Sequence, residues 1–289
     1  GTQVEAIIGR DLRYSDRFNV LDSLPPSLLG EGVDYRLWDQ LGATWLLTGQ
    51  MEGLGDSYVL VLTVHDVVYG EEKERGRFPI PDPSSPDFRM AVHRACDRVV
   101  EWVFGEPGMA ASRIAFSQRL ANGAQEIYLV DSDGENLRRL TNFGTITMSP
   151  AWHPSGEKLA YNSFREDTDG LPKIYEMNLR SGRERPLNPG RDGQQMSPSY
   201  HPNGREIAFG LLGYNRTGLF SYDLERNCCL THLQGGRWED ISPTYSPDGQ
   251  RLAFQSNRLG TANPQIYVMD VQGGEPELIS PYVYGPSAG

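Results

Sequence analysis

Two short stretches carry residue types that catalysis or metal binding uses. "GPSAG" (285–289) matches the G-x-S-x-G pattern of a nucleophilic serine, but that pattern works only between a strand and a helix, with a histidine later in the chain. No residue follows Gly289 to supply them, so we expect no catalysis there. "DSDGENLRRLTN" (131–142) opens like a calcium loop, yet its glycine comes two positions early and its twelfth residue is Asn142 where the loop needs glutamate. We interpret it as a turn between two strands.

The histidines lack the spacing of a metal site. His153 and His201 occupy equivalent positions of a repeated motif, and neither has an acidic partner within that motif. His65 and His93 belong to the first part of the chain, and we expect surface or capping roles for them. Because metal sites need several converging histidine, cysteine or carboxylate groups, we predict no metal ion and no catalytic histidine.

The three cysteines show no zinc or redox pattern. Cys228 and Cys229 are adjacent, and neighbouring cysteines rarely bond to each other because the eight-membered ring is strained. Cys96 falls on the apolar side of a predicted helix, where a free thiol packs as a small hydrophobic group. We predict no disulfide framework, and no motif indicates a cofactor.

Composition and charge exclude several classes of protein. The 289 residues are 38% hydrophobic and 22% charged, as in ordinary globular proteins. A net charge of −11 opposes nucleic-acid binding, which needs clustered lysine and arginine. No apolar run approaches the about 20 residues that span a bilayer, so we predict a chain that does not cross a membrane.

Residues 1–107 alternate helical and strand patterns. We expect a small mixed α/β domain in which two strands form a hairpin through the turn at 53–56. The last predicted helix repeats apolar residues from Phe88 to Val103 and ends at Gly105, since glycine commonly follows a helix. The other predicted elements are a helix at 4–15, a strand at 18–22 and a helix at 35–42.

Residues 112–289 repeat a strand pattern four times. Its clearest strands are "RIAFS" (113–117), "KLAYN" (158–162), "EIAFG" (206–210) and "RLAFQ" (251–255). Their aromatic residues, at positions 116, 161, 209 and 254, are spaced 45, 48 and 45 apart. A period of about 45 residues with four short strands per unit is typical of β-propeller blades.

Three of the four units open with Ser-Pro, an aromatic residue and a tight turn, as in "SPTYSPDG" (242–249). We place this proline at the start of a blade's inner strand, where it costs no ladder hydrogen bond. Because a blade cannot bury both of its faces alone, the repetition follows from packing and carries shape, not chemistry. The first of the four repeats lacks this opening strand. We therefore expect part of a longer propeller, with about four blades in this chain.

Both regions resemble the TolB family, the periplasmic component of the Tol-Pal system. The blade motifs are moderately specific, whereas their combination with this N-terminal region and the junction "GEPGMAASRIAF" (105–116) is much more so. The other matching stretches are "IIGRDLRYSDRFNVLD" (7–22), "LGATWLLTGQ" (41–50), "HDVVYGEE" (65–72), "SPAWHPSGEKLAY" (149–161) and "SPSYHPNGREIAF" (197–209).

The resemblance implies a small α/β domain followed by a six-bladed propeller of PD40 (WD40-like) blades, incomplete in this chain. It implies a non-enzymatic protein of the Gram-negative periplasm that binds the peptidoglycan-associated lipoprotein Pal through one propeller end. It further implies support of outer-membrane integrity and cell division, with TolA as a second partner. The family contacts TolA through an extreme N-terminal segment that this sequence lacks.

The Pal-binding end in the family involves loops that lead into the inner strands. The candidate partner-binding residues in this chain are therefore Gln194, Gln195, Met196, Ser197, Glu239, Asp240, Ile241 and Ser242.

An alternative interpretation is that the repeats form the propeller of an oligopeptidase-like hydrolase whose catalytic domain is absent, since related repeats occur in such enzymes.

Overall fold

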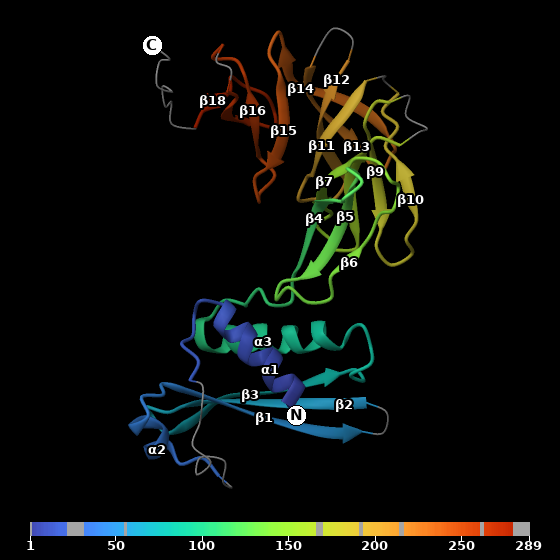
Figure 1. Cartoon of the computed structure of the whole chain (residues 1–289). Coiled ribbons are helices and arrows are strands. Elements are labelled where there is room, and N and C mark those ends of the chain that lie inside the picture. The colour runs from blue at the N-terminus through green and yellow to red at the C-terminus, as the bar shows by residue number, and fades with distance from the viewer. Residues whose placement is uncertain are drawn as a thin grey trace, which may run out of the picture. The chain divides into compact units, whose positions relative to one another are not determined.

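The chain forms two compact units (Figure 1). The first unit comprises Gly1–Ile114 with Val130–Leu137, and the second comprises Ala115–Leu129 with Arg138–Gly289. The computed structural model describes residues 2–21, 32–54, 57–165, 170–190, 193–213, 217–260 and 263–279. The "GPSAG" motif therefore lies outside the described residues.

The first unit is an antiparallel sheet with two helices on one of its faces (Figure 1). The sheet order is β1-β2-β3, and the central strand β2 supplies the buried Leu60, Leu62 and Val64. Helices α1 and α3 bury their apolar faces against these residues, which gives the unit one core. The elements are α1 (Thr2–Tyr14), α2 (Tyr35–Gln40), β1 (Trp45–Leu54), β2 (Ser57–Asp66), β3 (Glu71–Ile80) and α3 (Phe88–Phe104).

The three predicted helices and the hairpin of the first unit are confirmed, but two details differ. The strand predicted at 18–22 is wrong, because 18–21 have no regular structure; residue 22 lies outside the described part. Strand β3 was not predicted, since it opens with five exposed, charged residues on the sheet edge. Its Gly76 leaves room for Trp102 of α3, whose ring atoms would lie 2.7 Å from an added Cβ.

The described residues of the second unit form four successive antiparallel sheets. Three have four strands, in the orders β7-β8-β9-β10, β11-β12-β13-β14 and β15-β16-β17-β18, and the first has three, β4-β5-β6. In every sheet neighbouring strands follow one another along the chain, as in propeller blades. The predicted fold class, an α/β domain followed by an incomplete propeller, is confirmed.

The strand bounds within the second unit follow the predicted repeat. They are β4 (Arg113–Arg119), β5 (Gln125–Asp131), β6 (Arg138–Arg139), β7 (Thr147–Trp152), β8 (Lys158–Ser163), β9 (Lys173–Asn178), β10 (Glu184–Pro186), β11 (Gln194–Tyr200), β12 (Glu206–Leu212), β13 (Thr217–Asp223), β14 (Cys228–Gly236), β15 (Asp240–Tyr245), β16 (Arg251–Ser256), β17 (Gln265–Asp270) and β18 (Glu277–Leu278).

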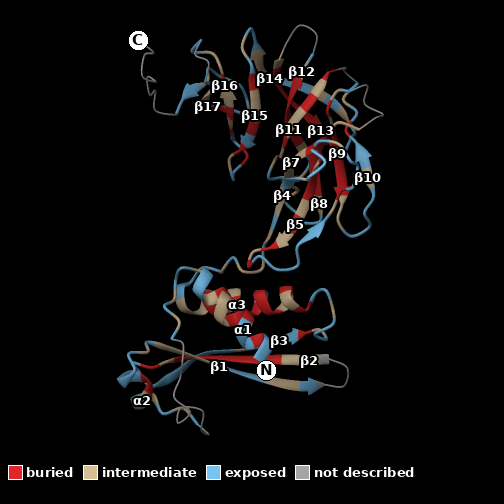
Figure 2. Cartoon of the chain, in the orientation of Figure 1, coloured by how far each residue is buried: buried red, intermediate tan, exposed pale blue. Residues whose placement is uncertain are grey.

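The repeated aromatic residue is the core of each complete sheet. Tyr161, Phe209 and Phe254 are almost fully buried, whereas Phe116 of the three-stranded sheet is only half-buried. Burial concentrates in the middle strands of the sheets (Figure 2), which are pressed against side chains of the neighbouring sheet. The aromatic residue recurs about every 45 residues because each complete sheet needs the same buried side chain at the same place.

The Ser-Pro pairs lie inside the inner strands instead of at their starts, so their predicted position is wrong. Each pair forms a β-bulge, and the serines Ser149, Ser197 and Ser242 have φ values of 56°, 52° and 52°. A bulge leaves one residue out of the ladder, so the proline costs no hydrogen bond there either. Among the described residues, no helix is both long and apolar enough to cross a membrane.

Candidate functional site

The inner strands β11 and β15 are neighbours and bring the two predicted loops together. Met196, Ser197, Ile241 and Ser242 are half-buried, and Ser242 Oγ donates to Ser197 Oγ across 3.4 Å. A β-bulge interrupts the ladder of each strand at its serine. Four of the eight candidate residues thus form one continuous patch.

Two other candidates, Gln195 and Asp240, belong to the framework of the blades. Gln195 is 1% exposed, and its Oε1 accepts from the backbone N–H of Ile174 at 3.0 Å. Asp240 is also 1% exposed, and its Oδ1 accepts from Arg258 Nη2 at 3.0 Å. A partner protein has no access to either side chain in this conformation.

The loop that enters β15 presents the exposed part of the patch. Arg237 is exposed and its guanidinium carbon lies 4.4 Å from the centre of the Trp238 ring, which is half-buried. Glu239 is exposed, and its backbone N–H donates to Asn257 Oδ1 at 3.0 Å, which fixes the loop. The loop therefore offers a cation, an aromatic ring and a carboxylate on a fixed backbone. Of these three, Glu239 is the one named among the candidate residues from the sequence.

We name this surface the entrance face. It consists of the accessible candidate residues together with the loop residues 237 and 238, and it excludes the two buried framework residues. Its members are Gln194, Met196, Ser197, Arg237, Trp238, Glu239, Ile241 and Ser242.

The repeated histidines join successive blades. His153 Nε2 donates to the carbonyl oxygen of Gly204 at 3.0 Å while its Nδ1 accepts from the backbone N–H of Ser155. His201 repeats the contact with the carbonyl of Gly249 at 3.2 Å. Because both ring nitrogens are used in packing, these two side chains are structural.

His65 and His93 are both buried, so the expected surface or capping roles are wrong. His65 Nδ1 lies 3.0 Å from the Tyr35 hydroxyl and its Nε2 lies 3.1 Å from Thr48 Oγ1. Burial lowers the pKa of His65, and the carboxylate of Glu72 acts weakly in the opposite direction. No local sequence pattern indicated this burial, because it depends on elements that pack together from distant parts of the chain.

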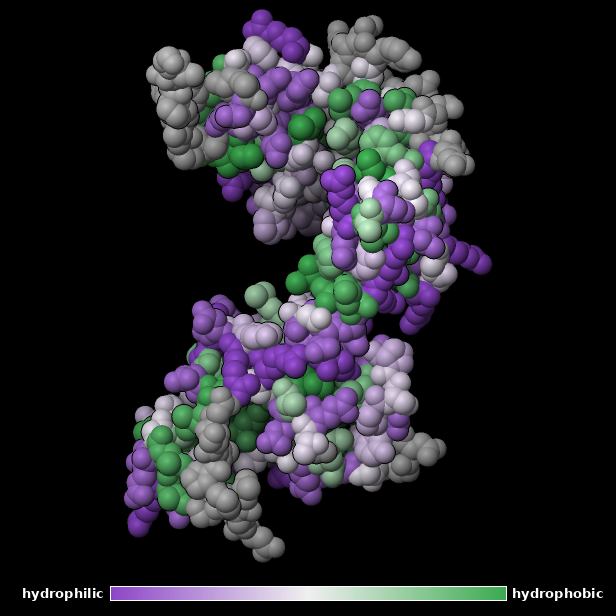
Figure 3. Space-filling view, in the orientation of Figure 1, coloured by the Kyte–Doolittle hydropathy of each residue, from purple (hydrophilic) through white to green (hydrophobic). Residues whose placement is uncertain are grey.

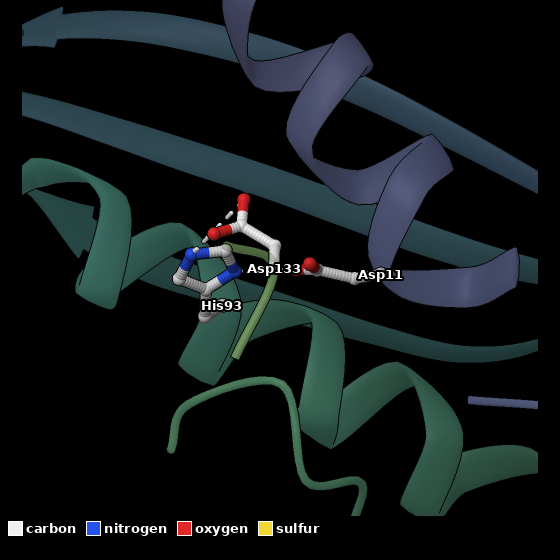
Figure 4. A group of neighbouring side chains, drawn as sticks. All are labelled: Asp11, His93 and Asp133. Carbon is white, nitrogen blue, oxygen red and sulfur yellow. Dashed lines mark hydrogen bonds and ion pairs between the residues drawn. The ribbon is translucent and has the colours of Figure 1, made fainter. Parts of the chain in front are cut away.

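His93 of α3 lies between two carboxylates in the first unit (Figure 4). Its Nδ1 is 2.7 Å from Asp11 Oδ2, and its Nε2 is 3.9 Å from Asp133 Oδ2. All three side chains are buried. Asp133 comes from the turn between β5 and β6, so the interpretation of 131–142 as a turn is confirmed. The ligand atoms of the three residues lie within 4.8 Å of one another.

The cysteines differ from the prediction in one respect. Cys228 and Cys229 form a disulfide at the start of β14, so the expectation that these neighbours do not bond is wrong. Cys229 has a φ of 66°, which lets the two side chains meet on one side of the strand. Cys96 is buried in the first core as predicted, and burial raises the pKa of its thiol.

Both regions of the chain match known families. Residues 1–73 match the TolB amino-terminal domain, and residues 100–283 match the TolB beta propeller domain. A Tol-Pal system protein TolB of Albidiferax ferrireducens is 30% identical over 63% of this chain and 42% of its own length. Another, of Methylococcus capsulatus, is 31% identical over 65% of this chain and 45% of its own length. The chain thus spans less than half the length of these curated relatives.

A solved structure agrees with the family matches. The crystal structure of TolB from Acinetobacter baumannii superimposes with a TM-score of 0.80 at 25% identity, covering 96% of this chain and 68% of that chain. Because the amino-terminal and propeller matches occur in the same order and the propeller match alone covers most of the residues, the chain belongs to the TolB family.

Proposed function

We propose that this chain is part of a non-enzymatic periplasmic protein of the Tol-Pal system that binds a Pal-type lipoprotein through its entrance face. The observation that carries this proposal is the loop 237–239 between β14 and β15, in which Arg237 lies over the Trp238 ring and the backbone of Glu239 is held by Asn257. Tryptophan and arginine are the residue types that most often dominate protein–protein binding energy. The proposed role is support of outer-membrane integrity and cell division.

The repeat itself supports the choice of surface. Frame positions of the blades recur and are buried, whereas the loops that enter the inner strands change in length and composition. On the side seen in Figure 3, hydrophobic residues gather in several separate groups among hydrophilic ones. A protein partner is therefore best accommodated where irregular loops present an aromatic ring and charges together. TolA follows from family membership as a further partner, and we assign no described residue to it.

Charge reversal at the entrance face tests the proposal. We expect the protein, expressed at its full natural length, to bind the soluble domain of the Pal-type lipoprotein from the same organism in a saturable manner. Arg237→Glu should weaken this binding about tenfold, mainly by slowing association, as measured by surface plasmon resonance.

The same strand provides a matched control. Strand β14 runs from Cys228 to Gly236, so Arg226 and Arg237 flank its opposite ends. Arg226→Glu makes the same charge change away from the entrance face and should leave the affinity unchanged. Absence of binding, or equal weakening by both substitutions, would refute the proposed function.

A further inference from the structure

The buried cluster of Asp11, His93 and Asp133 contains a polar atom without a partner. His93 is 0% exposed, and among the described residues its Nε2 has no hydrogen-bond partner. Asp133 Oδ2 is 3.9 Å away, which is too long for a hydrogen bond. A buried nitrogen that points at a carboxylate across such a gap needs a third group to satisfy it.

The other ring nitrogen of His93 is held as in a metal site. Nδ1 lies 2.7 Å from Asp11 Oδ2, so the carboxylate fixes the ring and favours the tautomer with its free electron pair on Nε2. Metal-ligating histidines in proteins almost always have such a carboxylate or carbonyl behind them. Asp11 thereby directs Nε2 into the gap toward Asp133.

The gap is slightly wider than a bound ion requires. Zinc lies about 2.0–2.1 Å from histidine nitrogen and carboxylate oxygen in a tetrahedral arrangement, which holds two ligand atoms about 3.3 Å apart. Nε2 and Asp133 Oδ2, now 3.9 Å apart, therefore approach each other by about half an ångström when one ion binds both. Arg89 already donates to Asp133 Oδ2, as outer residues do for ligating carboxylates. Arg10 contacts the same oxygen at 3.5 Å and Glu135 at 3.1 Å, so an ion would displace only the longer of its two contacts.

The ion pairs around the cluster leave it with a net negative charge. Three carboxylates and two guanidinium groups contact one another here, which gives a formal charge of −1 when the imidazole is neutral. This charge favours a cation over an anion at the site. The groups are Asp11, Asp133, Glu135, Arg10 and Arg89.

We propose that this cluster binds a divalent transition-metal ion of the zinc type, with His93 Nε2 and Asp133 as ligands and Asp11 as the carboxylate that orients the histidine. Imidazole among the ligands favours zinc-type ions over calcium and magnesium, which prefer oxygen ligands alone. Water would complete the coordination. The proposal replaces the sequence prediction of no metal ion and is independent of the partner-binding function.

Zinc titration of the metal-free protein tests this site. The full-length protein, stripped with a chelator, is titrated with Zn²⁺ against a chromophoric chelator, with Mg²⁺ and Ca²⁺ as separate arms. We expect one Zn²⁺ per chain, at least tenfold weaker binding in His93→Gln and in Asp133→Asn, and about 10–100-fold weaker binding in Asp11→Asn. His153→Gln, which alters a half-buried histidine of the second unit, should bind as the unaltered protein does.

Several outcomes would overturn the proposal. They are the absence of stoichiometric Zn²⁺ binding, unchanged binding in His93→Gln, and binding of Ca²⁺ or Mg²⁺ as tight as that of Zn²⁺. If the substituted proteins do not fold, the assigned ring resonances of His93 in the unaltered protein decide. They must shift on addition of one equivalent of Zn²⁺, and their failure to shift would also overturn it.

Discussion

Replacing Arg258 by alanine is expected to lower the free energy of unfolding by about 3–5 kcal/mol, the usual cost of removing one partner of a buried ion pair. Asp240 is 1% exposed and accepts a hydrogen bond from Arg258 Nη2 at 3.0 Å. The Arg258 guanidinium also lies over the rings of Phe254 and Tyr267, so it fills space between two strands of one blade. The alanine variant leaves a buried carboxylate without its cation and a gap beside two aromatic rings.

Urea denaturation followed by circular dichroism measures this effect. Arg226→Ala is the matched control, because Arg226 is exposed and lies 3.7 Å from Asp223 in a surface ion pair, which contributes about 0–1 kcal/mol. A loss below about 1 kcal/mol in Arg258→Ala would mean that Asp240 is not held in the blade as described. Asp240 would then return to the set of accessible candidates.

Replacing Trp238 by alanine is expected to weaken binding of the Pal-type lipoprotein by about 2 kcal/mol, or about 30-fold in Kd. The ring is half-buried and carries Arg237 on its face at 4.4 Å. Its removal takes away a large rigid contact surface and also frees the arginine that the ring positions. Both losses weaken the contacts that this chain makes with the lipoprotein.

Isothermal titration calorimetry with matched aromatic deletions checks this expectation. Tyr69 is 80% exposed in the turn between β2 and β3 of the first unit, so Tyr69→Ala removes an exposed aromatic ring that is not part of the entrance face. We expect Tyr69→Ala to bind normally and Trp238→Phe to retain part of the affinity. Normal binding by Trp238→Ala would remove this residue from the proposed interface.

The propeller was predictable from the sequence because its core repeats. Tyr161, Phe209 and Phe254 are each buried between sheets, and the same packing demand recurs in every blade. Strand β3 was not predictable in the same way. It lies at a sheet edge and begins with exposed charges, so only its far end shows an alternating pattern.

The sequence alone could not fully distinguish accessible partner-binding residues from buried framework residues. Gln195 and Asp240 occupy the same repeat position as Thr147 but are different residue types. From the sequence alone, such variation at a repeat position indicates a role in binding a partner. All three are nevertheless buried, at 1%, 1% and 0% exposure, and each makes a side-chain hydrogen bond to a different partner. Burial at this position depends on the neighbouring sheet, which no local pattern reveals.

No local sequence pattern could have predicted the cluster around His93. Asp11, His93 and Asp133 are far apart in the sequence, and the last of them lies in a turn that resembled a defective calcium loop. They converge because the 130–137 segment belongs to the same compact unit as α1 and α3. Only a prediction of that packing would have placed a carboxylate on each side of the histidine.

Hydrogen–deuterium exchange of the complex with the Pal-type lipoprotein tests the entrance face most directly. We predict slower amide exchange in residues 193–197 and 236–242 when the partner is bound, and unchanged exchange in the turn 224–227 at the opposite end of β14. Unchanged exchange at the entrance face, with slowing confined to other parts of the chain, would contradict the central claim.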